Sequence, residues 1–241
     1  MDHASNFEIR ARLADQVRPP DPGPNGVSVT RSRNTLGLGI TLAAMFALAE
    51  LGRGPMFAAK ADAVRCEIKP YATCTGADLT GAQLANKRIT AGQLRRADLT
   101  RADLRATVLQ GAYLTDAILR RANLSDADLR GATLVRADLT GATLHRASFA
   151  DTRMDQALLR DTDARKANFT GAQLHDVDFR GADLREAIFV GATLNGADLQ
   201  GANLESAELD GGGWQPSANL SGATWIDGSV CQPGSMGRCR N

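Results

Sequence analysis

Ala77-Asp78-Leu79-Thr80-Gly81 is a five-residue phrase that the chain repeats, with variations, as far as Asp210. Stepping by five from Leu79 gives 27 consecutive units, and 26 of them carry Leu, Ile, Phe or Met at the third position. Two residues earlier, 21 of the 27 units carry Ala. A period of five fits neither the 3.6-residue repeat of a helix nor the two-residue alternation of a strand. The backbone must therefore turn once in every unit.

The order of residues within a unit predicts a solenoid. Ala and Leu stand two apart, which places both side chains on the same side of an extended backbone. Turn-forming residues follow Leu in most units, with glycine at Gly81, Gly111, Gly131, Gly141, Gly171, Gly181, Gly191, Gly196 and Gly201. One such unit buries nothing alone, so the units must stack around a continuous narrow core. Such a core also explains why only 5% of the chain is aromatic.

The pattern A-(D/N)-L-x-x occurs in Ala122-Asn123-Leu124, Ala127-Asp128-Leu129 and Ala202-Asn203-Leu204. It resembles the pentapeptide-repeat family over a little more than half of the chain. The resemblance implies an all-β fold, a right-handed quadrilateral β-helix with four units in each coil. Phe149, Phe169 and Phe189 are spaced by twenty, so coils of twenty residues would stack these rings in one column.

Two departures from the phrase bear on the local fold. Lys87 stands where Ala should point inward, and burying an unpaired ammonium is costly. We therefore expect a bulge or a loose coil over residues 85–93. Ala164 replaces the large core residue and predicts a small void or a tighter local coil.

The N-terminal segments differ from the repeats. Residues 1–34 include a proline-rich run that predicts a disordered extension. Residues 35–63 follow the arginines of Arg31-Ser32-Arg33, contain an apolar run of 14 residues, and end in Ala61-Asp62-Ala63, the parts of a secretory signal peptide. An uncleaved membrane anchor through residues 36–59 and an apolar segment of a cytosolic protein stay open as alternatives. We divide the rest into an N-terminal cap at 64–74, a solenoid at 75–210 and a C-terminal cap and tail at 211–241.

Four cysteines flank the array, Cys66 and Cys74 before it and Cys231 and Cys239 after it. Four cysteines allow three disulfide connectivities. The ends of the rod lie too far apart for a disulfide, which joins Cα atoms at most about 7 Å apart, so we expect one local bridge at each end. Disulfides favour an oxidising compartment and hence a periplasmic or secreted protein. Free thiols are the alternative, and a zinc site is less favoured because neither pair is C-x-x-C.

The ends of the solenoid need covers, because open strand edges invite aggregation. The phrase stops after Leu209 and resumes one residue late at Ala218-Asn219-Leu220. We expect Trp214 and Trp225 to cover the last coil, and residues 67–74 to cover the first. The ending after Trp225 is similar to tails of exported bacterial members of the family.

No constellation of residues indicates catalysis. The aspartates recur because the repeat places them beside Leu, and no phosphate-binding loop or nucleophile triad is present. His145 and His175 follow core leucines, should point to solvent, and fall on opposite sides of a four-sided coil. We therefore expect no enzyme activity, cofactor, metal site or small-molecule substrate.

Coils of twenty residues sort the charges by side. Two neighbouring sides gather most of the basic residues of the array, and these form the candidate basic surface: Arg101, Arg105, Arg120, Arg121, Arg146, Arg160, Arg165, Lys166, Arg180 and Arg185. Rows of aspartates run beside them. Two interpretations stay open, a solvated ladder of ion pairs and a surface for an anionic partner.

These features predict a non-enzymatic structural or interaction module, exported to the cell envelope, that binds a macromolecular or anionic partner through its flat sides. Some family members mimic DNA and bind gyrase, and this is the alternative function. Residues 75–210 contain 19 acidic and 17 basic residues, a net charge of −2, without the strongly acidic face that a DNA mimic needs. Binding to nucleic acid is not expected, and dimerisation stays open because the tail has no helical pattern.

Overall fold

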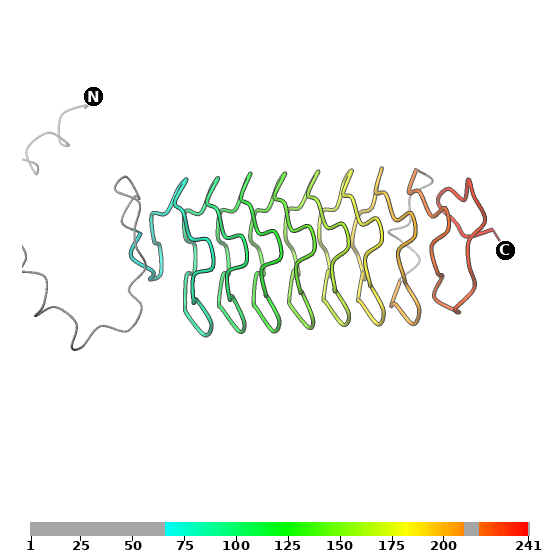
Figure 1. Cartoon of the computed structure of the whole chain (residues 1–241). Helices are drawn as coiled ribbons and strands as arrows, with labels where there is room; N and C mark the ends of the chain where they lie inside the picture. Colours follow the sequence, from blue (N-terminus) through cyan, green and yellow to red (C-terminus); the bar gives the residue numbers. More distant parts are fainter. Residues whose placement is uncertain (1–65, 210–216, 241) are drawn as a thin grey trace, which may run out of the picture. The chain divides into compact units, whose positions relative to one another are not determined.

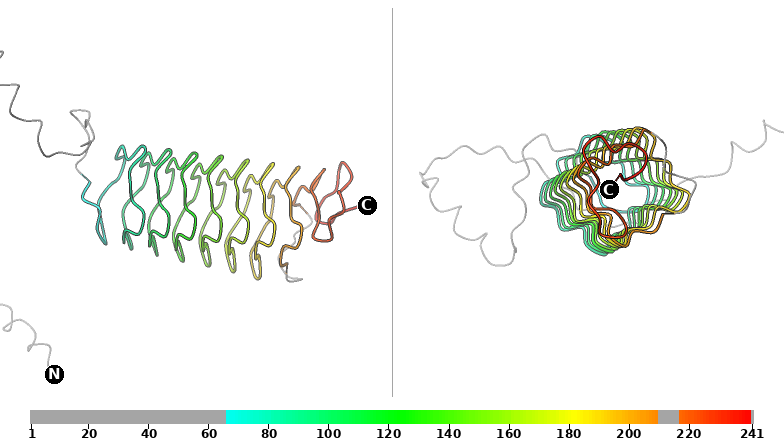
Figure 2. Two further views of the ribbon diagram at one scale, coloured as in Figure 1. Left: turned by 60° about the horizontal axis from the view of Figure 1, so that its bottom comes forward. Right: turned by 90° about the vertical axis from the view of Figure 1, so that its right-hand side faces the viewer.

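The computed structural model describes residues 66–209 and 217–240. Their regular structure consists of single-residue β-bridges, one in each five-residue unit, separated by turns. From Thr73, which pairs with Gln93, to Ile188, which pairs with Glu208, each bridge is parallel and joins a residue to the one twenty positions later. Residues 73–208 thus form a β-solenoid with four bridges in each twenty-residue coil, and its coils stack in register along one axis (Figures 1 and 2).

Backbone hydrogen bonds explain why a period of five is stable. In the unit at Leu99, the Leu99 N–H donates to Ile118 O in the next coil at 2.7 Å, and Asp98 N–H donates to Ala77 O in the previous coil at 2.9 Å. The Ala102 N–H closes the turn onto Leu99 O at 2.9 Å. The second residue after each core residue takes a left-handed conformation, such as Arg101 with φ 58°. This costs an L-residue about 1–2 kcal/mol, which explains the glycines found at many of these corners.

The core contains the alanine and leucine columns, most of whose members are at most 1% exposed. Threonine replaces alanine at three buried positions, and each hydroxyl donates to a backbone carbonyl. The pairs are Thr107 with Leu84 O at 2.8 Å, Thr152 with Phe149 O at 2.6 Å and Thr162 with Leu159 O at 2.9 Å. A buried hydroxyl is therefore tolerated where a backbone carbonyl of its own turn or of the preceding coil accepts its hydrogen bond.

Four phenylalanines form one cluster inside the coils. Phe169 stacks between Phe149 and Phe189, with ring centroids 5.2 and 5.1 Å apart. The ring of Phe179 lies edge-on to Phe169 at 5.8 Å and to Phe189 at 6.2 Å. Sequence reasoning missed Phe179, which stands ten residues from Phe169 on the opposite side. The interior is narrow enough for rings from opposite sides to meet.

The expected bulge over residues 85–93 is wrong. Arg88 pairs with Val108 and Gln93 with Tyr113 in the same twenty-residue register as the units on either side of them. Lys87 is exposed, because a long aliphatic stem can carry its ammonium out to water without moving the backbone. The coil at Ala164 is not tightened either, since its N–H donates in register to Asp183 O at 2.8 Å; the void expected there stays a prediction.

Ile89 and Gly92 depart from the phrase together. Ile89 is the only isoleucine at a leucine position of the array, and Gly92 is the only glycine at an alanine position. A Cβ on Gly92 would lie 2.6 Å from Ile89 Cγ2, closer than van der Waals contact allows. The branched methyl of Ile89 therefore takes the space that the alanine methyl fills in other units.

Gly92→Ala should accordingly destabilise the protein by about 1–3 kcal/mol, the usual effect of overpacking a core. Adding Ile89→Leu restores the phrase and should recover most of that loss. Urea unfolding of the two single variants and the double variant measures this coupling. Equal losses for Gly92→Ala with and without Ile89→Leu would contradict the steric explanation.

Both ends of the array are covered by chain. After residues 210–216, the register shifts to 21, with Asp198 paired to Asn219, in agreement with the late resumption of the phrase. The tail then folds back in antiparallel bridges, Asn219 with Met236 and Thr224 with Val230, a cover that sequence reasoning missed. Trp225 packs partly buried on the core, whereas Trp214 lies outside the described residues.

At the other end, the segment expected to cover the first coil pairs along one side of it. Thr73 bridges Gln93, and the Tyr71 N–H donates to Thr90 O at 2.8 Å. Ala72 and Cys74 are buried in the alanine and leucine columns. The solenoid thus begins at residue 72 rather than at 75.

The cysteines form two local disulfides. Cys66 is bonded to Cys74, with Cα atoms 5.0 Å apart, and Cys231 to Cys239, with Cα atoms 4.9 Å apart. The expected extension at 1–34 and the signal-like segment at 35–63 lie outside the described residues. Within residues 66–209 and 217–240, no helix has the length and apolar character needed to cross a membrane.

Candidate functional site

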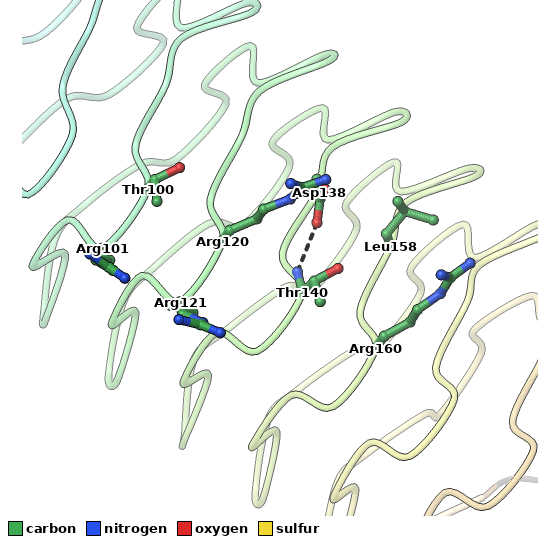
Figure 3. A pocket seen from close by; sticks show the side chains of 8 residues that line it. All are labelled: Thr100, Arg101, Arg120, Arg121, Asp138, Thr140, Leu158 and Arg160. Carbon is green, nitrogen blue, oxygen red and sulfur yellow. Dashed lines mark hydrogen bonds and ion pairs between the residues drawn. The ribbon is translucent and has the colours of Figure 1, made fainter.

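One side of the solenoid carries a groove of about 480 Å³ that runs across four successive coils (Figure 3). We call it the arginine groove. Its lining comes from residues 97–101, 117–121, 137–141 and 157–161, the same side of each coil, and consists of Thr100, Arg101, Arg120, Arg121, Asp138, Thr140, Leu158 and Arg160. The groove therefore gathers four of the ten residues of the candidate basic surface.

The floor of the groove contains a buried carboxylate that is fully engaged. Asp138 is 9% exposed; its Oδ2 accepts from Arg120 Nε at 2.6 Å and its Oδ1 from the Thr140 N–H at 3.0 Å. Burial alone would raise the pKa of Asp138, but the bonds from Thr140 and Arg120 outweigh it and hold this pKa below its usual value. Asp138 is therefore ionised at neutral pH and neutralises Arg120.

Arg160 is directed away from the groove to the next coil. Its Nε donates to Oδ2 of Asp178, which also accepts from Arg180 at 2.7 Å. Figure 3 shows the guanidinium of Arg160 turned away from Arg120 and Arg121. Its charge is thus balanced outside the groove.

Arg101 and Arg121 are different. Both are exposed, and neither makes an ion pair with any residue of 66–209 or 217–240. They stand at the left-handed corner of successive coils, with φ 58° and 55°, and lie along the same edge of the groove (Figure 3). The groove thus has two positive charges without a counterion in the described part of the chain.

The other members of the candidate basic surface are paired. Arg105, Arg146, Arg165, Lys166, Arg180 and Arg185 form ion pairs with Asp103, Asp126, Asp163, Glu186, Asp178 and Asp183, respectively. The interpretation as a ladder of ion pairs is therefore right for these six residues. Four of the six pairs join an arginine to the aspartate two residues before it, a sequence signal that was missed and that Arg101 and Arg121 lack. The pairs of Arg146 and Lys166 join neighbouring coils and depend on rotamers that the repeat does not fix.

The histidines were expected to face solvent, and this is wrong in part. His145 and His175 are both half-buried. The Nε2 of His175 lies 3.4 Å from the Thr193 hydroxyl in the next coil, and Nδ1 of His145 is buried. Within the described ranges, His, Cys, Asp and Glu side chains form no group of three or more that could hold a metal ion.

Replacing the buried Asp178 tests the energetics beside the groove. Asp178→Asn should cost about 1–3 kcal/mol, because two arginines lose a charged acceptor; the exposed Asp126→Asn should cost less. Burial alone would raise the pKa of Asp178, but the hydrogen bonds from Arg180 and Arg160 outweigh it and hold this pKa below its usual value. Its contribution is therefore complete above the unfolded pKa of about 3.9 and lost as pH falls through the lower folded pKa.

Thermal unfolding of wild type and both variants at pH 7, 4 and 3 measures this. The difference between wild type and Asp178→Asn should be largest at pH 7 and shrink below about pH 4. A difference that is constant down to pH 3 would contradict the assignment.

A family model described as pentapeptide repeats matches the chain in eight copies. The matched residues are 88–121, 97–134, 107–146, 122–161, 142–181 and 178–211. None of the curated proteins matches the chain.

Several solved structures are similar. A pentapeptide repeat protein from the thylakoid lumen of Arabidopsis thaliana is 33% identical, with 39% of this chain and 64% of that one covered and a TM-score of 0.37. HetL, a pentapeptide repeat protein involved in heterocyst differentiation regulation in Nostoc, is 30% identical over 67% of this chain and 90% of its own, with a TM-score of 0.32. Full-length QnrB1, a plasmid-mediated fluoroquinolone resistance protein, is 20% identical over 67% and 89%, with a TM-score of 0.39. The chain spans slightly less than two thirds of the Arabidopsis protein.

Proposed function

The chain belongs to the pentapeptide-repeat family, and we propose that it is a non-enzymatic interaction module of the cell envelope. In this proposal the coils form a right-handed quadrilateral β-helix, and the side that carries the arginine groove contacts an anionic partner. The observation that supports it best is the contrast between Arg101 and Arg121, which have no counterion among the described residues, and the paired basic residues around them.

Physical considerations favour a binding surface over a catalytic site. The groove offers guanidinium and hydroxyl donors, and its carboxylate is already bonded to Arg120 and Thr140. Unpaired arginines on a flat, rigid side attract anionic partners and orient them. The gyrase alternative needs an acidic face that resembles DNA, and a groove with two unpaired positive charges is opposite to this in sign.

Export is supported by the two disulfides, since such bonds persist in oxidising compartments, and by the signal-like pattern of residues 35–63. The mass of the protein isolated from its native host tests it. We expect a chain that begins near Val64 and is four hydrogens lighter than its reduced form. A full-length, fully reduced chain in the cytosol would overturn this part of the proposal.

Fractionation of the native host tests the binding surface. Wild-type protein should sediment with the envelope and be released by high salt, because salt screens exposed charges. Arg101→Gln with Arg121→Gln should move most of the protein to the soluble fraction. Arg88→Gln with Arg96→Gln is the matched control: it removes two exposed arginines outside the groove that have no ion pair in the described ranges, and it should fractionate as wild type. Equal behaviour of the two double variants would exclude a role for the groove.

A further inference from the structure

The chemistry of the arginine groove narrows the class of its ligand. Arg120 is bonded to Asp138 and Arg160 to Asp178, whereas Arg101 and Arg121 have no carboxylate partner among the described residues. We propose that the groove binds a ligand with two or more linked phosphate groups. This inference rests on the function proposed above and names the chemistry that the same surface recognises.

The spacing of the two free arginines calls for more than one negative charge. Arg101 and Arg121 occupy the same corner of successive coils, so their backbones lie about 4.8 Å apart, the spacing of neighbouring strands. Two guanidinium groups on neighbouring coils repel each other unless an anion lies between them. A ligand that spans both coils with an anionic group at each would remove that repulsion.

Glycines flank this pair of arginines on both sides. Gly81 precedes Arg101 and Gly141 follows Arg121 at the same corner of the adjoining coils. The stem of Arg121 lies over Gly141, with Cγ 3.5 Å from the point where a Cβ would stand. The two free charges are therefore one isolated pair rather than part of a continuous ladder.

The remaining lining supplies donors suited to phosphate oxygens. The backbone N–H groups of Thr100 and Thr140 donate to Asp98 and Asp138, and the two hydroxyls line the groove, that of Thr140 beside the Asp138 carboxylate. Guanidinium forks bind phosphate through two parallel hydrogen bonds. A volume of about 480 Å³ is more than one phosphate ion needs and lies in the range of small-ligand sites. A single carboxylate would leave both charge and donors unsatisfied.

Titration calorimetry of the full-length, disulfide-bonded protein with tripolyphosphate tests the proposal. We expect saturable 1:1 binding, at least tenfold tighter than that of inorganic phosphate and of citrate, which carries carboxylates. Arg101→Gln with Arg121→Gln should weaken it at least tenfold, while the control pair Arg88→Gln with Arg96→Gln should change it less than twofold. Circular dichroism and thermal unfolding verify that both double variants fold as wild type.

A second measurement identifies the source of the phosphate groups. Vesicles containing a lipid with a phosphorylated inositol headgroup are compared with pure phosphatidylcholine vesicles. If the protein binds the charged vesicles and tripolyphosphate releases it from them, the proposal is supported with a lipid headgroup as the ligand. If the protein binds tripolyphosphate but not the vesicles, the proposal is supported with a soluble phosphate ester as the ligand.

Absence of saturable tripolyphosphate binding, equally tight citrate binding, or equal losses in the two double variants would overturn the proposal. If tripolyphosphate does not bind, but Arg101→Gln with Arg121→Gln still moves the protein from the envelope fraction to the soluble fraction, only the ligand class is wrong and the proposed function stands.

Discussion

Phe169→Ala is expected to destabilise the solenoid by about 3–5 kcal/mol, the usual effect of truncating a buried aromatic side chain. Its ring stacks on Phe149 and Phe189 and meets Phe179 edge-on. The truncation therefore removes three aromatic contacts as well as apolar area, and such contacts add about 0.5–1.5 kcal/mol per pair. Urea unfolding followed by circular dichroism measures the loss.

Phe169→Leu is the matched control, because most units of the array carry Leu at this core position. It keeps the core position filled and should cost clearly less than the alanine variant. Phe149→Ala, whose ring has one aromatic neighbour, should fall between them. A loss of less than 1 kcal/mol for Phe169→Ala would show that the cluster does not stabilise the coils.

Deletion of one whole coil is expected to leave a folded protein. Removing residues 112–131 joins Gly111 to Ala132 and restores the phrase, so every later residue keeps its column. Bridges between residues twenty apart then re-form one coil earlier. Repeat proteins lose roughly one repeat and one interface of stability in such a change, so the variant should unfold cooperatively at lower urea concentration.

A deletion of nearly the same length is the control. Removing residues 112–129 leaves Arg130 and Gly131 as two extra residues after Gly111, which moves all later alanines and leucines out of their columns. At least the coils on one side of the junction should then fail to form, with loss of circular dichroism signal and rapid proteolysis. Equal stability of the two deletions would contradict a period of five.

The repeat predicted the columns of the core because a side chain two residues from Leu must share its side of the backbone. It also indicated the register of 21 at the C-terminal end, where Ala218 resumes the phrase late. It gave no signal for the antiparallel return of the tail at Met236, because that pairing depends on chain reversal outside the repeat. The bulge expected at Lys87 was wrong because the whole side chain was assumed to be buried. Its long aliphatic stem separates the backbone from the charge.

The arginine groove was predictable only in part. The side on which Arg101, Arg120, Arg121 and Arg160 lie follows from a coil of twenty residues. The coil length does not predict which of these arginines stay unpaired. Arg120 and Arg160 reach carboxylates 18 residues ahead in the next coil, whereas Arg101 and Arg121 lie at corners flanked by glycine.

Distances between spin labels test the winding of the backbone most directly. Arg96, Arg136 and Asp176 are exposed and occupy one corner of the solenoid, separated by two coils at each step. Electron spin resonance of the label pairs 96/136 and 96/176 should give mean distances that differ by about 10 Å, since each coil adds about 4.8 Å. A difference of several tens of ångströms, as for 40 further residues of helix at 1.5 Å each, would contradict the account.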